Sequence, residues 1–236
     1  MSAPNVTRWI GIGLLGLPLY GAMTFFSSLD PQPDPNTHLE AWSRFVTTDS
    51  YVLKHLLLSD LGIVFAIFGT FALGVHLASS HAGRRGLWAM VVTVFGSALF
   101  LTIGGVTTFA APEEGQAVLA GVEEFESLPT IFANTLMMAT FGVAVLLMLA
   151  GNVLLGVAVW RSGTLPKWAG ALWVAGSALP LLGQLYIMLP IGADSTPPTV
   201  PMGAVLLVVG GAWMAYRVLR EPSPATVGVG AQPRVQ

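Results

Sequence analysis

The 236-residue chain contains no cysteine, which excludes disulfide frameworks, thiolate metal sites and thiol catalysis. Charged side chains are also scarce: only 9% of the residues are Asp, Glu, Lys or Arg, against about a quarter in ordinary globular domains. So few charges cannot cover the surface of a soluble protein of this size, which excludes the soluble enzyme classes. The net charge of −2 argues against nucleic acid as a partner.

Apolar side chains make up 54% of the chain, and they gather in six long stretches. Each stretch is long enough to cross a hydrocarbon core of roughly 30 Å, which takes about 20 helical residues. Backbone inside a bilayer must hydrogen-bond within its own segment, so the stretches should be helices. The sequence therefore predicts an all-α, polytopic membrane helix bundle with six transmembrane helices over residues 1–221, followed by a disordered cytoplasmic tail over 222–236. The predicted spans are 8–28, 51–78, 88–111, 129–160, 168–190 and 201–219.

The basic residues predict the orientation of these spans, because Lys and Arg are retained on the cytoplasmic side. With the N-terminus inside, eight of the ten basic residues are cytoplasmic. Five tryptophans also fall at the predicted cytoplasmic helix ends, where an amphipathic ring prefers the interface. We therefore expect both termini to be cytoplasmic in a bacterial plasma membrane. The eight basic residues are Arg8, Arg84, Arg85, Arg161, Lys167, Arg217, Arg220 and Arg234, and the tryptophans are Trp9, Trp88, Trp160, Trp168 and Trp213.

Two outer segments have amphipathic patterns. Thr37 and Glu40 have capping-box spacing, and the apolar residues from Leu39 to Val46 recur at helical intervals, which predicts a short helix on the outer leaflet. A second such segment is expected to open at Pro112 and to continue to Phe125. Either segment could cap the bundle.

Some residues should interrupt the helices or bring them together. Pro18, Pro180 and Pro190 predict kinks in the first and fifth spans, although broken helices can also expose carbonyls to a substrate. In the second span, small residues follow one another at four-residue spacing, which favours close approach of a neighbouring helix. These small residues are Gly62, Ala66, Thr70 and Gly74.

Asp60 is the sharpest candidate, because a carboxylate within a span needs a donor, water or a bound proton. It lies roughly 7 Å to the outer side of the predicted bilayer centre. Lys54 is about 240° away around the helix, so Gln184, Tyr20 and Tyr186 are the expected partners. The candidate ligand-binding set, which could line an outward-opening pocket, is Asp60, His55, Lys54, Gln184, Tyr186, Tyr20, Asn134 and Thr107. The alternative is that Asp60 only joins helices by hydrogen bonding.

His55 and His76 invite a test for haem. They are 21 positions apart, or about 31 Å along one helix, so they cannot bind one haem together, and no other span contains a histidine. His38 and Glu40 have no convincing third ligand for a metal. No catalytic motif is present, so we predict no catalytic residues, no metal and no cofactor.

Two motifs resemble a known group of proteins. Residues 54–57 (KHLL) enter a span that reaches Gly69-Thr70-Phe71 and then Gly83-Arg84-Arg85-Gly86, and residues 161–170 read RSGTLPKWAG. They resemble a broad, domain-of-unknown-function group of six-helix bacterial membrane proteins, common in actinobacteria. In that group a histidine opens the second span and a turn similar to SGxLPxWAG follows the fourth. The resemblance implies the six-span topology and draws attention to His55, but it implies no activity.

Two functions remain open at this point. The first is binding or transport of a small ligand, or of a proton, through the pocket around Asp60. The second is a non-catalytic accessory or assembly role beside a membrane protein partner. A cavity leading from Asp60 to the outer surface would favour the first function, and an exposed apolar lateral patch would favour the second.

Overall fold

The computed structural model describes residues 3–30, 32–122, 133–188 and 198–220, and every regular element in these ranges is helical. The all-α prediction is therefore confirmed for the described chain. The predicted tail over 222–236 lies outside it. The elements are α1 (Ala3–Leu14), α2 (Gly16–Ser27), α3 (Leu39–Val46), α4 (Asp49–Lys54), the π-helical turn η1 (His55–Asp60), α5 (Leu61–Ala78), α6 (Arg84–Leu119), α8 (Thr135–Ser162), α9 (Lys167–Met188) and α10 (Thr199–Leu219).

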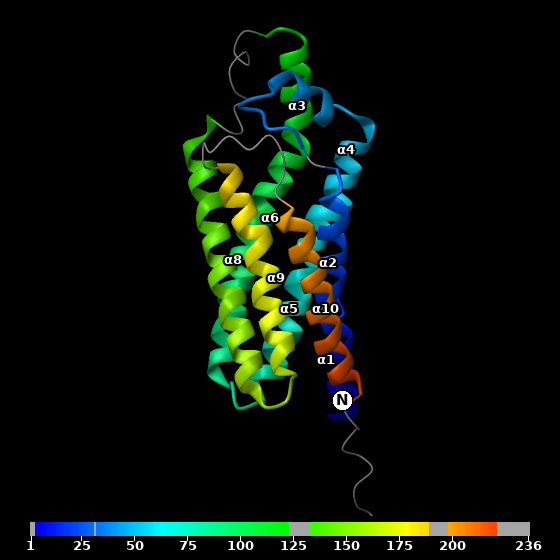
Figure 1. Ribbon diagram of the computed structural model, residues 1–236, viewed down its shortest axis with the longest axis vertical. Coiled ribbons are helices and arrows are strands. Elements are labelled where there is room, and N and C mark those ends of the chain that lie inside the picture. The colour runs from blue at the N-terminus through cyan, green and yellow to red at the C-terminus, as the bar shows by residue number, and fades with distance from the viewer. Residues whose placement is uncertain (1–2, 31, 123–132, 189–197, 221–236) are drawn as a thin grey trace, which may run out of the picture.

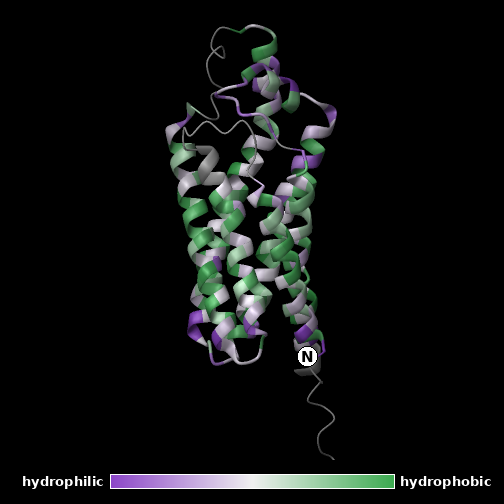
Figure 2. Cartoon of the chain, viewed as in Figure 1, coloured by the Kyte–Doolittle hydropathy of each residue, from purple (hydrophilic) through white to green (hydrophobic). Residues whose placement is uncertain are grey.

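Five helical segments of the described chain are long and apolar enough to cross a membrane. Figure 2 shows apolar residues along the bundle and hydrophilic residues gathered toward its two ends. This distribution is that of a membrane protein. The helix α9, over the fifth predicted span, is not among the five, but it packs between α8 and α10 in the same bundle (Figure 1). The five segments are Val6–Ser27, Asp49–Ala78, Arg84–Leu119, Thr135–Ser162 and Thr199–Leu219.

The long helices form a closed ring of neighbours. In order around the ring, α5 contacts α6, then follow α8, α9, α10 and α2, and α2 contacts α5 again. One apolar core joins these helices, and its largest side chains are completely or almost completely buried. Side chains from helices on different sides of the ring meet in this core and hold the ring together. Its members include Leu14, Leu73, Leu155, Trp173 and Leu207.

The first predicted span is two helices rather than one. The break lies at Leu15, between α1 and α2, while the sequence placed a kink at Pro18. Proline has no N–H, so Pro18 leaves the carbonyl of Leu14, four residues earlier, without its helical donor. Close to this carbonyl, the N–H of Leu15 bonds to Ile12 O, three residues earlier, at 3.0 Å. This shorter spacing tightens the turn at that point.

The third predicted span ends at residue 111, but α6 continues to Leu119 as one 36-residue helix with Pro112 inside it. The prediction that Pro112 opens a separate amphipathic helix is therefore wrong. Proline in a helix removes one hydrogen bond, and packing of α3 against this part of α6 offsets that loss. The rest of the predicted amphipathic segment, from residue 123 on, lies outside the described residues.

The short helix α3 confirms the predicted helix over 39–46. Trp42 and Val46 are fully buried, so α3 packs one face on the end of α6 (Figure 1). The predicted capping box is wrong: His38 is the N-cap residue and makes no side-chain capping bond. Glu40 instead pairs with Arg44, one turn further along α3.

A buried polar contact joins α8 to α9. The Nε1–H of Trp173 donates to Asn152 Oδ1 at 2.9 Å, and Asn152 Nδ2 donates to Met148 O at 2.8 Å. Asn152→Ala should lower the free energy of unfolding by about 1–2 kcal/mol, because it leaves the indole N–H unpaired in an apolar core. Chemical denaturation in detergent micelles measures the change. Thr102→Ala is the control, since that exposed hydroxyl bonds only to Ala98 O of its own helix, and an equal loss in the control would refute the assignment.

Candidate functional site

The candidate site is a hydrogen-bonded chain of three side chains near the α3 end of the bundle. Asp60 is 7% exposed and Thr108 is fully buried. The Thr108 hydroxyl lies 2.8 Å from Asp60 Oδ2, and Nδ1 of the half-buried His55 contacts the same hydroxyl. One threonine of α6 therefore connects the two titratable groups of η1. His55 therefore faces α6.

The π-helical turn explains why both groups reach one threonine. In an α-helix, residues 55 and 60 would point about 140° apart, at 100° per residue. In a π-helix the hydrogen bond runs from residue i+5 to residue i, so these residues lie over one another. The N–H of Leu61 bonds to Leu56 O in this pattern. The extra residue in the turn thus places His55 and Asp60 on the same side of the helix.

The backbone of α6 is adapted to the site on both sides of Thr108. A Cβ atom on Gly104 would lie 2.5 Å from Asp60 Oδ1, so only glycine leaves room for the carboxylate here. The Thr108 hydroxyl also lies 2.8 Å from Gly104 O. Pro112 removes the N–H that would otherwise bond to the Thr108 carbonyl.

The chain of contacts permits two arrangements of hydrogen atoms. A threonine hydroxyl carries one hydrogen and accepts others, and either nitrogen of histidine can donate or accept. With Asp60 ionised, Thr108 donates to Asp60 and accepts from the Nδ1–H of His55. With Asp60 protonated, Asp60 donates to Thr108 and Thr108 donates to Nδ1 of a neutral His55. Both arrangements satisfy the contacts among His55, Thr108 and Asp60, and in each the single hydroxyl hydrogen is used within this chain rather than for Gly104 O.

Aromatic rings cover the histidine on the α3 side. The ring of Tyr51 stacks on His55, with centroids 5.4 Å apart and planes inclined by 18°. Phe45 of α3 meets Tyr51 edge to face at 5.9 Å. The helix α3 is therefore connected to the site through two ring contacts.

Two polar contacts hold the end of α2 and the residues after it against this segment. Lys54 Nζ lies 2.8 Å from Asp30 Oδ2, in an ion pair whose side chains are each about half exposed. The hydroxyls of Ser27 and Ser59 lie 3.1 Å apart. These contacts fix η1 between α2 and α6.

The predicted candidate set is only partly brought together. His55 and Asp60 meet at Thr108, whereas Lys54 is engaged by Asp30 and Asn134 caps α8 by accepting from the Met137 N–H. Thr107 hydrogen-bonds to carbonyls of its own helix.

Tyr20 lies beside Gly62, at the contact between α2 and α5, and packs on the apolar core. Gln184 and Tyr186 lie on α9 in a stretch whose side chains fall outside the described residues. Among the described residues, Asp60 hydrogen-bonds to Thr108, which the candidate set did not include. Sequence patterns do not reveal the π-turn, and this turn changes which residues of span 2 face α6.

No metal site accompanies this centre: the described residues contain no group of three His, Asp or Glu side chains placed to hold an ion. The comparisons with family models, curated proteins and solved structures gave no match to this chain. The resemblance to the six-helix bacterial group therefore stays a prediction.

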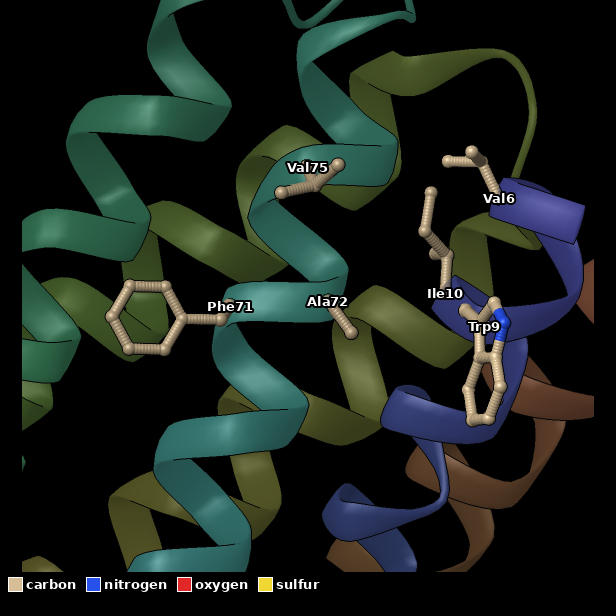
Figure 3. A pocket seen from close by; sticks show the side chains of 6 residues that line it. All are labelled: Val6, Trp9, Ile10, Phe71, Ala72 and Val75. Carbon is tan, nitrogen blue, oxygen red and sulfur yellow. The ribbon is translucent and has the colours of Figure 1, made fainter. Parts of the chain in front are cut away.

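A separate apolar groove of about 450 Å³ lies between α1 and α5. Figure 3 shows Val6 and Ile10 of α1 facing Val75 of α5, with Ala72 at the floor and Phe71 pointing away from α1. The groove is lateral and lined almost wholly by apolar side chains. It is far along α5 from the polar centre.

Gly104→Ala tests how tightly the carboxylate is held. Alanine favours a helix over glycine by about 1 kcal/mol, so the substitution should stabilise α6 if space were available. We expect instead a net loss of stability of about 1–3 kcal/mol, because the added methyl group displaces Asp60 from Thr108. Gly105→Ala is the matched control, since its methyl group meets no atom within 4 Å. Thermal unfolding measures the melting temperatures of both variants. Equal melting temperatures would contradict the close packing of Gly104 against Asp60.

Proposed function

We propose that the chain is a six-span protein of the bacterial plasma membrane with both termini in the cytoplasm. The structure's helix order supports this, because the N-terminus, the turns at 79–83 and 163–166 and the end of α10 lie at one end of the bundle (Figure 1). Seven basic residues lie at that end, namely Arg8, Arg84, Arg85, Arg161, Lys167, Arg217 and Arg220. Retention of Lys and Arg in the cytoplasm then orients the bundle, with α3 outside.

Within this topology the protein binds and moves a proton in the outer half of the membrane. The observation that carries the proposal is the single threonine hydroxyl between a buried carboxylate and a half-buried histidine. Ionisable groups within spans are costly and typically mark proton or ligand sites. A π-turn at the same position is also typical of functional sites.

The proton transfer involves two bonds. Nδ1–H of a protonated His55 gives its hydrogen to Thr108 Oγ1 while the Thr108 hydroxyl gives its own to Asp60 Oδ2. The products are neutral His55, an intact threonine hydroxyl and protonated Asp60, so charge and hydrogen atoms balance. His55 is the more exposed end of the chain and Asp60 the more buried end. The proton therefore enters from the side of α3.

A second function, an accessory subunit of a membrane complex, is favoured by the groove between α1 and α5. Its exposed walls include Trp9, at 62% exposure, and Val75. An apolar transmembrane helix of a partner would suit such a surface, and packing in membranes depends on close fit of this kind. In that case the Asp60–Thr108 bond only joins η1 to α6.

Cysteine labelling tests the topology, because the chain has no cysteine of its own. Asn36→Cys and Ser79→Cys place single thiols at exposed positions near opposite ends of the bundle, and Arg220→Cys follows α10. We expect a membrane-impermeant maleimide to label only the Asn36 variant on intact cells. Labelling of the Arg220 variant without permeabilisation would show that α9 does not cross the membrane.

Thr108→Val tests the relay. Valine keeps the shape of threonine and removes the hydroxyl, so Asp60 should lose its hydrogen-bond donor and its hydrogen-bonded path to His55. Infrared spectroscopy of the Asp60 carboxyl band, followed against pH, measures this, and Asp60→Asn identifies the band by removing it. Proton flux into proteoliposomes should fall at least about tenfold in both variants if the relay contributes as general proton transfer usually does.

Thr107→Val is the matched control, since that hydroxyl bonds only within its own helix. It should keep both the hydrogen bond to Asp60 and the flux. If Thr108→Val and Asp60→Asn leave flux unchanged and alter only stability, the relay is refuted and the accessory function is favoured. The melting temperature of each variant separates loss of fold from loss of transfer.

A further inference from the structure

A second concavity lies at the opposite end of the bundle from the Asp60 centre. It is a groove of about 380 Å³ between the start of α6 and the last turns of α8, closed at one side by the turn after α5. This volume is within the range of small-molecule sites. Its principal lining residues are His81, Arg85, Trp88, Leu154, Val157 and Arg161.

The charge in the groove is entirely positive. Arg85 and Arg161 come from different helices and line the same space. The described chain contains two ion pairs, Arg44 with Glu40 and Lys54 with Asp30, and neither includes these arginines. No Asp or Glu occurs between residues 61 and 112 or between 135 and 188, so the helices around the groove carry no acid to neutralise them. Two guanidinium groups that have no ion-pair partner among the described residues favour a phosphate.

The remaining walls are apolar and open toward the lipid side of the helices. Leu154 and Val157 are 48% and 41% exposed, and with Arg161 they follow one face of α8 at spacings of three and four residues. Trp88 is 63% exposed and stands one turn after Arg85 on α6. The groove thus has a cationic rim at the helix ends and an apolar wall extending into the bundle's hydrophobic zone.

We propose that this groove binds an anionic phospholipid, such as phosphatidylglycerol. The phosphodiester lies between the guanidinium groups of Arg85 and Arg161, and an acyl chain lies along Leu154 and Val157. The indole of Trp88 lies at the level of the glycerol backbone, where tryptophan is favoured in membranes. Basic pockets between transmembrane helices are suited to lipid headgroups for the same reasons. The lipid bridges α6 to α8 at the end of the bundle remote from the proton centre.

Native mass spectrometry of the purified full chain in detergent tests the proposal. Phosphatidylglycerol is titrated against phosphatidylcholine with the same acyl chains. The double variant Arg85→Gln with Arg161→Gln should lose about thirtyfold in affinity for phosphatidylglycerol, from about 1 kcal/mol for each basic group. The control pair Arg84→Gln with Arg217→Gln removes the same charge from exposed positions outside the groove, and should lose at most about threefold.

Three outcomes would overturn the proposal. Equal loss in both double variants would mean that only general charge attracts the lipid. Equal binding of phosphatidylcholine and phosphatidylglycerol would mean that Arg85 and Arg161 do not select an anionic lipid. Competition by inorganic phosphate at the affinity of the lipid would mean a free phosphate site without an acyl chain. Val157→Trp fills the apolar wall and leaves the arginines intact, and it should weaken the lipid while leaving phosphate unaffected.

Discussion

Asp60 needs a hydrogen-bond donor because a carboxylate loses its water when helices close around it in a membrane. The local structure follows from this requirement. Thr108 supplies the hydroxyl, Gly104 leaves the space, and the π-turn aligns His55 with the same hydroxyl. A helix of uniform α geometry would point His55 away. The polar centre therefore determines both the irregular turn of the second span and the small residue facing it on α6.

The positions of the helices follow from simple patterns, so most of the fold could be predicted. Long apolar runs and clustered basic residues locate the helices, and the spacing from Leu39 to Val46 locates α3. The partner of Asp60 could not be predicted in this way. A sequence does not display the extra residue of a π-turn, which turns Asp60 toward Thr108 of α6. The side chains of Gln184 and Tyr186, two of the expected partners, lie outside the described residues.

The prolines are a second case in which local sequence patterns do not predict the structure. Pro18 lies in the first span, but the break appears at Leu15, beside the Leu14 carbonyl that lacks its donor. Pro112 has the same chemistry and does not end its helix. There Val46 of α3 and the following Thr47 pack against Gly115, one turn beyond the proline, and support the continuous helix. The residues next to a proline in the sequence do not reveal its packing against segments that are distant in the chain.

The length of α6 has a structural consequence. Its 36 residues extend about 54 Å, while a hydrocarbon core spans roughly 30 Å. The helix is therefore longer than a hydrocarbon core requires, and the turns beyond Pro112 carry the contacts with α3. Thr108 lies one turn before Pro112, so the helix that holds Asp60 and His55 together is the same rod that supports α3.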